Sequence, residues 1–311
     1  MLLNILFIVV GIALVLWGAD RLTDGAVAVA EKMKMPQIVI GLTIVAMGTS
    51  MPEFCVSFIS ALKGTSDLAV GNIVGSNIFN ALLIVGVSAL VAPMTIMETT
   101  VRKDIPFALV ASALLLIMCL DGNISRIDAG ILFAMFLIFM YMTLKGAKKQ
   151  GADAEAADEA EGKKPMATWL SVVWILVGLL CLIGGSNLFV EGATAVATNL
   201  GVSEAVIGLT IVAGGTSLPE LATSVVSARK GNSGIAIGNV LGSNVFNILA
   251  ILGVTGIITP MTLKGITYID LSMLVISIMI VWLFSFTKYK IERWEGAVLT
   301  AVFVGYIYSL L

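Results

Sequence analysis

The sequence predicts an all-α polytopic membrane protein with about ten transmembrane helices, arranged as two inverted five-helix repeats. Of its 311 residues, 59% are hydrophobic and only 12% are charged, and the mean hydropathy is +1.04. Soluble domains are about 45–50% apolar and about 25% charged, so this composition excludes an ordinary soluble domain. At about 20 apolar residues per crossing, the chain has room for roughly ten spans and for no sizeable extramembrane domain.

The expected helices are apolar runs bounded by charged residues, proline or glycine. The first run lacks the basic segment of a signal peptide, so we expect a retained helix. The first and sixth runs exceed the length of a perpendicular crossing, and we expect both to be tilted or to extend beyond the hydrocarbon core. In chain order the runs cover residues 3–30, 37–62, 68–91, 105–120, 127–144, 168–198, 205–228, 235–258, 268–286 and 294–310.

The positions of Lys and Arg predict the orientation. With the amino terminus outside, 14 of the 18 basic residues fall on one side, whereas Lys63, Arg126 and Lys264 fall on the other and Arg21 lies within the first helix. The positive-inside rule therefore predicts a multi-pass protein of the cell (inner) membrane with both termini outside.

One hydrophilic stretch divides the chain. It predicts a first five-helix repeat over 1–146, a cytoplasmic acidic linker over 147–166 and a second repeat over 167–311. Five acidic residues lie between Lys pairs in this stretch and no large apolar residue accompanies them. A solvated connector is favoured over a weak calcium sensor, because nothing there resembles a preformed ligand loop.

A duplicated motif relates the two halves. A shift of 167 residues sets GLTIVAMGTSMPE (41–53) on GLTIVAGGTSLPE (208–220), and GNIVGSNIFN (71–80) on GNVLGSNVFN (238–247). From Gly41 to Asn80, 25 of 40 aligned positions are identical. Five spans, an odd number, separate equivalent positions, so we expect the second copy to be inverted in the membrane. Inverted repeats are typical of secondary transporters, whose site lies near the midplane.

Composition also excludes several chemistries. The chain has no histidine, which removes imidazole metal sites and Ser-His catalysis, and the net charge of -2 does not indicate a nucleic-acid partner. Cys55, Cys119 and Cys181 lie singly in apolar stretches and are interpreted as small hydrophobic residues. We therefore expect no enzyme, no cofactor and no obligate protein partner.

Two acidic residues are the main candidates for function. Glu53 and Glu220 lie deep in hydrophobic helices, with no intramembrane Lys or Arg nearby. A buried charge in a membrane is costly and by default functional. The prolines before them, Pro52 and Pro219, should break each helix and free main-chain carbonyls at Gly48 and Gly215.

Polar residues of the third and eighth spans complete the candidate site. Serine and asparagine at i and i+4 share one helix face, at Ser76 with Asn80 and at Ser243 with Asn247. Asn72 and Asn239 continue these faces, whereas Asn77 and Asn244 lie beside them and fit helix packing equally well. The glycine pairs Gly71–Gly75 and Gly238–Gly242 should let another backbone approach closely. At the inner end of the first helix, Asp20, Arg21 and Asp24 can pair locally, and a structural role is favoured over gating.

The motifs GTSMPE and GTSLPE, each followed by GNxxGSNxFN, resemble the two α repeats of the cation/calcium antiporter superfamily, and the closest branch is the prokaryotic sodium/calcium exchangers. The Gly-Asn-Ala-Ala-Glu signature of the proton/calcium branch is absent. The resemblance implies calcium ligation by the carboxylates of Glu53 and Glu220 and the carbonyls of Thr49 and Thr216. It implies sodium binding by the same glutamates, by serine hydroxyls and by main-chain carbonyls, with two asparagines completing the centre: Ser50, Ser217, Ser76, Ser243, Ala46, Ala213, Asn80 and Asn247. In several members of the family an aspartate takes the position of Asn247.

These observations predict a secondary antiporter in the lipid bilayer that exchanges Ca²⁺ for Na⁺ by alternating access. A proton- or potassium-dependent cation/calcium exchanger is the first alternative, and a passive cation channel with the two glutamates as its filter is the second.

Overall fold

A computed structural model describes residues 1–154, 166–201 and 213–310 of the chain. Its first half contains α1 (Leu2–Lys32), α2 (Gln37–Ile40), the π-helix η1 (Gly41–Val45), α3 (Ala46–Thr49), α4 (Met51–Leu62), α5 (Ser66–Ile78), the π-helix η2 (Phe79–Ile84), α6 (Val85–Val91), β1 (Met94–Thr95), the π-helix η3 (Thr100–Asp104), α7 (Ile105–Met118), the 3-10 helix η4 (Cys119–Asp121), β2 (Asn123–Ile124) and α8 (Arg126–Ala154). Its second half contains α9 (Thr168–Asn199), α11 (Ala213–Thr216), α12 (Leu218–Arg229), α13 (Ser233–Val245), the π-helix η6 (Phe246–Ile251), α14 (Leu252–Ile258), β3 (Met261–Thr262), α15 (Tyr268–Ser285), β4 (Lys290–Ile291) and α16 (Arg293–Leu310).

The all-α prediction is confirmed, and helices lie within each of the ten expected runs. The expected run 205–228 is described only from Ala213 onward. Among the described residues, seven helices are long and apolar enough to cross a membrane, and the bent pair Gln37–Thr49 and Met51–Leu62 adds an eighth if it forms one span. The chain is therefore a helical membrane protein with seven or eight such spans in its described part.

One boundary differs from the expectation. α8 continues to Ala154, so the first residues of the expected linker are helical. Residues 147–154, AKKQGADA, include three Ala and two Lys, which are good helix formers, and the polar composition that suggested a connector does not prevent helix formation. The rest of the expected acidic linker, 155–165, lies outside the described residues.

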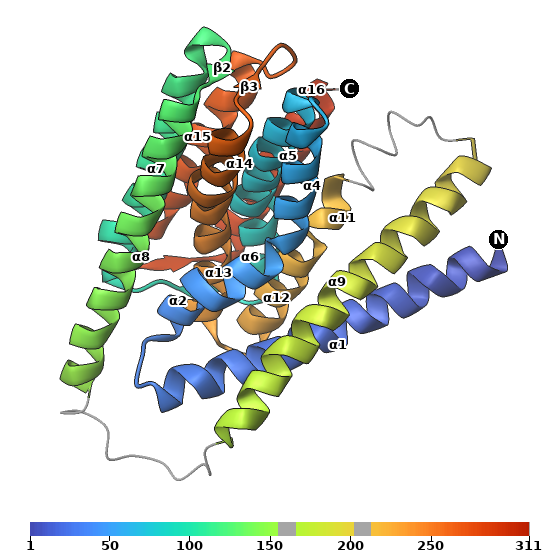
Figure 1. Ribbon diagram of the computed structural model, residues 1–311. Coiled ribbons are helices and arrows are strands. Elements are labelled where there is room, and N and C mark those ends of the chain that lie inside the picture. Colours follow the sequence, from blue (N-terminus) through green and yellow to red (C-terminus); the bar gives the residue numbers. More distant parts are fainter. Residues whose placement is uncertain (155–165, 202–212, 311) are drawn as a thin grey trace.

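Two long helices, α1 and α9, form a pair that crosses the other helices obliquely (Figure 1). Glycines recur every seven residues on both facing surfaces: Gly11, Gly18 and Gly25 on α1, and Gly178, Gly185 and Gly192 on α9. Seven residues make almost two turns, so the glycines of each helix share one face. A Cβ at Gly18 would lie 2.8 Å from the carbonyl oxygen of Gly178, and the reverse contact is also 2.8 Å. The two backbones thus touch directly along the pair.

The core of the molecule surrounds α5–η2–α6 and α13–η6–α14. In the most apolar stretch of Ser233–Ile258, 83% of the residues are buried, against 22% in Leu2–Lys32, so the former helix is central and the latter peripheral. α4 and α12 pack beside these central helices, and α7, α8, α15 and α16 enclose them (Figure 1).

Two short antiparallel pairings connect the halves of the chain. β1 pairs with β4, and β2 pairs with β3. Each pairing joins one strand of the first half to one strand of the second half, so neither half can form these strand pairings alone.

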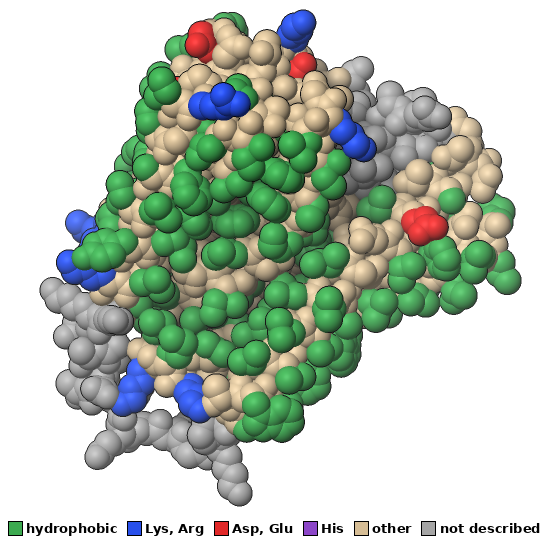
Figure 2. Space-filling view, in the orientation of Figure 1, with side chains coloured by type: hydrophobic (Ala, Val, Ile, Leu, Met, Phe, Trp, Pro, Cys, Tyr) green, Lys and Arg blue, Asp and Glu red, His purple; other side chains and the backbone are tan. Residues whose placement is uncertain are grey.

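The surface matches a membrane environment. Figure 2 shows hydrophobic side chains over the middle of the visible face and Lys and Arg near its upper and lower ends. Large apolar side chains such as Leu16, Ile117 and Leu180 are more than half exposed. Lipid is the solvent that makes such exposure favourable.

Candidate functional site: a cage of oxygen atoms

In each of the two signature motifs, the helix breaks at the equivalent serine, Ser50 or Ser217. α3 ends at Thr49 and α4 begins at Met51, and the two helical segments are bent by 48°. Ser50 has φ -82° and ψ 9°, and Ser217, between α11 and α12, has φ -91° and ψ 6°. The expected breaks at the proline motifs are therefore present. Each places its glutamate in the first turn of the next helix.

The two glutamates are linked across the breaks. Ser217 Oγ donates a hydrogen bond of 3.0 Å to Glu53 Oε1, and Ser50 Oγ donates one of 2.9 Å to Glu220 Oε1. Glu53 is fully buried and Glu220 is 1% exposed. Neither carboxylate forms an ion pair with a described Lys or Arg. Two buried carboxylates thus lie in one region without a basic partner.

The serines of the central helices lie next to this region. Ser76 on α5 places its Oγ 3.2 Å from Ser217 Oγ, which extends the hydrogen-bonded chain that ends on Glu53. Ser243 occupies the matching position of α13 and is fully buried.

Asn80 and Asn247 each lie in a π-helical turn, η2 and η6. Such widened turns are rare in proteins overall, and many of those that occur lie at functional sites. Each side chain is 1% exposed or less. Asn80 Nδ2 donates to Asn244 Oδ1 at 3.1 Å, and Asn247 Nδ2 donates to Asn77 Oδ1 at 2.9 Å.

Asn77 and Asn244 fix the direction of these two amides. Asn77 Nδ2 donates to the main-chain oxygen of Asn244 at 3.1 Å, and Asn244 Nδ2 donates to that of Asn77 at 3.4 Å. A main-chain oxygen only accepts, so each of these side chains must present its Oδ1 to the neighbouring asparagine. Asn80 and Asn247 must therefore turn their own Oδ1 atoms away from this contact. The Asn77–Asn244 contact joins α5 to α13, as the helix-packing interpretation expects, and a site role for these two residues stays a prediction.

Asn72 and Asn239 form hydrogen bonds to the two helices that carry the glutamates, α4 and α12. Asn72 Nδ2 donates to the main-chain oxygen of Glu53 at 3.3 Å and to Ser57 Oγ at 2.9 Å. Asn239 Nδ2 makes the equivalent bonds to Glu220 at 3.2 Å and to Ser224 Oγ at 3.0 Å. Sequence reasoning did not single out Ser57 and Ser224, although they are identical in the aligned repeats.

One of the main-chain carbonyls expected at the site, that of Ala46, already accepts hydrogen bonds. The carbonyl of Ala46 accepts from Ser50 N at 3.0 Å and from Thr49 Oγ1 at 3.3 Å. Thr49 Oγ1 also donates to Asn239 Oδ1 at 3.0 Å, so Thr49 is tied to α13. Thr216 ends α11, and Ala213 begins it.

Two expectations about backbone contacts need correction. The carbonyl of Gly215 is not free, because the hydroxyl of Ser186 on α9 donates to it. The glycine pairs also differ from each other. A Cβ at Gly238 would lie 2.6 Å from the carbonyl oxygen of Ile38, as a close packing contact requires, whereas a Cβ at Gly75 would meet no described atom of another element within 4 Å. Close approach of another backbone is therefore confirmed only for the second pair.

Five buried side-chain oxygens of the site have no hydrogen-bond partner among the described residues. Four of them form two matching pairs, Glu53 Oε2 with Glu220 Oε2 and Asn80 Oδ1 with Asn247 Oδ1, and the fifth is Ser243 Oγ. Unpaired buried acceptors cost free energy unless something compensates them. Hard cations such as Ca²⁺ and Na⁺ take oxygen ligands of these kinds. Among the described residues, no group of three or more His, Cys, Asp or Glu is placed to hold a metal ion.

One side of the cage is more accessible than the other. A cavity of about 490 Å³ lies between α5, α15 and α16, and Asn72, Gly75 and Ser76 line it. On the matching side, Asn239 and Ser243 are fully buried. Ser76 thus connects the cavity to the hydrogen bonds that lead to Glu53.

Comparisons with known proteins place the chain among related sequences and structures. The family model described as "Sodium/calcium exchanger protein" matches residues 3–145 and 170–311. The inner membrane protein YrbG of Escherichia coli is 36% identical, and the match covers 100% of this chain and 97% of that protein. The sodium/calcium exchanger MaX1 of Methanosarcina acetivorans is 30% identical, with 99% and 98% covered. A solved structure of the sodium-calcium exchanger NCX_Mj, soaked with Na⁺ and Ca²⁺, superimposes with a TM-score of 0.87 at 30% identity and covers 100% of this chain and 99% of its own.

Proposed function

The chain belongs to the sodium/calcium exchanger protein family and is a cation/calcium antiporter, and from this premise we propose that it exchanges Ca²⁺ for Na⁺ at the cage between Glu53 and Glu220. The observation that carries the proposal is the set of four buried acceptor oxygens without a donor. Two are carboxylate oxygens and two are amide oxygens. Bound cations compensate carboxylate and amide oxygens alike, whereas protons compensate only the carboxylates.

Charge explains how the two ions are coupled. Two carboxylates neutralise either one Ca²⁺ or two Na⁺, so both ions compete for the same site. An empty cage leaves about two buried, uncompensated charges, which makes its closure unfavourable. The carrier therefore changes conformation with ions bound, and exchange follows.

Residues have distinct parts in this proposal. Glu53 and Glu220 with the carbonyls of Thr49 and Thr216 bind Ca²⁺. The glutamates, the carbonyls of Ala46 and Ala213 and four serine hydroxyls bind Na⁺, with Asn80 and Asn247 facing the centre; the serines are Ser50, Ser217, Ser76 and Ser243. Asn77 and Asn244 orient the amides.

Alternating access follows from an arrangement of ten spans as two inverted five-helix repeats, with Glu53 and Glu220 near the membrane midplane. The positive-inside distribution supports termini outside and a cytoplasmic connection between the repeats. In that orientation the cavity beside Ser76 opens toward the outside.

A flux measurement tests the proposal. Purified protein in sodium-loaded liposomes should take up radioactive calcium on dilution into sodium-free medium. Uptake that ignores the sodium gradient contradicts the proposal. Potassium and proton gradients in place of sodium test the alternative exchangers, and uptake that needs no counter-ion indicates a channel.

A further inference from the structure

The α1/α9 pair is tied to the core by an ion-pair network at one end. Lys230 caps the C-terminal end of α12, and its Nζ lies 2.5 Å from Asp20 Oδ1 and 2.7 Å from Asp24 Oδ1. Arg21 holds the other oxygen of Asp20 at 2.7 Å, and its guanidinium lies 5.0 Å from the centre of the Trp174 ring. Lys230 therefore links α1 directly to α12, and Arg21 of the same group lies against Trp174 of α9.

This link acts directly on the helix that carries a site carboxylate. Lys230 lies ten residues after Glu220, at the opposite end of α12. A further polar contact between α1 and α12, Thr23 Oγ1 to Ser227 Oγ at 3.0 Å, lies at the same end. Since the glycine contacts hold α1 and α9 together, any movement of the pair past the site must break this group of contacts.

The other end of the pair carries part of this set without the contact. The 167-residue shift aligns Lys63 with Lys230 and Glu191 with Asp24, whereas Asn187 stands at the position of Asp20. Lys63 caps the C-terminal end of α4, ten residues after Glu53, and Glu191 lies on α9. Both are exposed, and neither has an ion pair with any residue in the described ranges. In Figure 1, α4 rises toward the upper end of the molecule and α12 runs toward the lower end, so the two positions lie at opposite ends.

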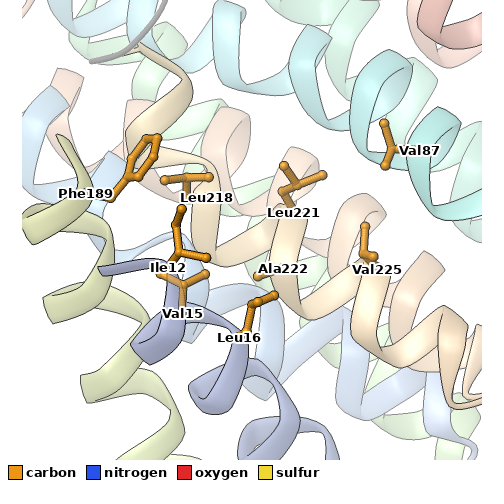
Figure 3. A pocket seen from close by; sticks show the side chains of 9 residues that line it. All are labelled: Ile12, Val15, Leu16, Val87, Phe189, Leu218, Leu221, Ala222 and Val225. Atoms are coloured by element: carbon orange, nitrogen blue, oxygen red, sulfur yellow. The ribbon is translucent and has the colours of Figure 1, made fainter. Parts of the chain in front are cut away.

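Between the pair and the core, the packing is incomplete. A cavity of about 290 Å³ lies here, and all its lining side chains are apolar. Figure 3 shows Ile12 and Leu16 of α1 and Phe189 of α9 opposite Leu218, Leu221 and Val225 of α12. Apolar surfaces slide without breaking directional bonds. The polar contacts at the ends, rather than this interface, then determine where the pair rests.

We propose that Lys230 and Lys63 are alternating ionic latches of the α1/α9 pair. In the conformation described, Lys230 holds Asp20 and Asp24 and keeps the pair against α12. In the opposite conformation these bonds break, the pair swings toward α4, and Lys63 binds Glu191. This inference rests on the proposed alternating-access function and assigns a role to two lysines outside the ion cage.

Spin labels on the two parts test the proposal. Ile59 on α4 is 49% exposed and Leu200 after α9 is 68% exposed. Each is replaced by a spin-labelled cysteine in a variant that lacks the three native cysteines, Cys55, Cys119 and Cys181. The distance between the two labels then reports the separation between the core and the α1/α9 pair. Pulsed dipolar spectroscopy is recorded in nanodiscs at fixed Na⁺ without a gradient. The shorter distance between the labels belongs to the conformation in which the pair lies near α4. Lys230→Gln should raise the population with this shorter distance at least about threefold, and Lys63→Gln should lower that population by a similar factor.

Matched variants keep the test decisive. Lys264→Gln removes an exposed lysine outside both latches and should change nothing. If Lys230→Gln does not fold, Lys63→Gln still decides, because Lys63 has no described ion pair to lose. The charge-exchanged Lys230→Asp with Asp24→Lys should return the distribution toward that of the parent.

Unchanged distributions in the lysine variants, or shifts of both in the same direction, overturn the latch. The distances are measured without transport, so they remain valid if the flux assay rejects Na⁺/Ca²⁺ exchange. The two proposals therefore fail independently.

Discussion

At the scale of single residues, each signature motif completes the other. Ser217 of the second motif satisfies one oxygen of Glu53, and Ser50 of the first satisfies one oxygen of Glu220. The second oxygen of each carboxylate has no partner among the described residues, and in the proposed function an ion binds it. Neither motif could form this arrangement alone, since its serine and its own glutamate face different partners.

This reciprocity predicts that both carboxylates are required. Glu53→Gln and Glu220→Gln should each weaken calcium binding at least about a hundredfold, because breaking one buried charge pairing costs ~3–5 kcal/mol. Calcium binding to the purified variants measures the loss. Glu98→Gln removes a carboxylate from an exposed ion pair with Arg102 and should leave binding unchanged. Near-normal binding in either site variant would make that glutamate a structural group.

A second prediction concerns amide orientation. Asn77→Ala removes the acceptor of Asn247 Nδ2, so the Asn247 amide can turn and present a donor to the ion. Calcium affinity should fall about tenfold, as is usual when a residue that orients a ligand is lost. Asn199→Ala, at the exposed end of α9, is the control. Parental affinity in Asn77→Ala would mean that Asn77 only packs α5 against α13.

At the scale of elements, the sequence predicts the helices and both breaks well. Proline and glycine have strong local effects, and the apolar runs are long, so the serine breaks and most boundaries follow from local chemistry. The partners of the polar residues could not be predicted in this way. The Asn77–Asn244 contact joins residues 167 positions apart, and the Ser186 hydroxyl reaches Gly215 only because α9 crosses α11.

The α1/α9 contact gives an element-scale prediction with an internal control. A Cβ at Gly185 would lie 2.8 Å from the carbonyl oxygen of Gly11, whereas Gly184 has no described heavy atom within 4 Å. Gly185→Ala should lower the free energy of unfolding by ~1–3 kcal/mol through overpacking. Gly184→Ala should raise it by up to ~1 kcal/mol, because alanine favours the helix.

Thermal unfolding in one detergent compares the two variants. Equal midpoints would show that the helices of the pair separate freely and do not form a rigid unit. A loss only in Gly185→Ala would support the rigid body on which the latch depends.

At the scale of the whole molecule, the two halves depend on each other. Each short strand pairing takes one strand from each half, and the ion cage takes one carboxylate and one asparagine from each. The duplicated motif predicts that the copies meet. It does not predict the strand pairings, because two-residue strands have no periodicity to detect, nor the difference in accessibility between Ser76 and Ser243.

The central claim is that Ca²⁺ and Na⁺ compete for one cage with two negative charges, and equilibrium calcium binding at increasing Na⁺ tests it most directly. Purified protein is titrated with calcium while choline replaces sodium at constant ionic strength, so that screening does not change. If two sodium ions displace one calcium ion, the apparent dissociation constant should rise about a hundredfold for each tenfold increase in Na⁺ above saturation of the sodium sites. A calcium affinity that stays the same when sodium replaces choline would contradict the account.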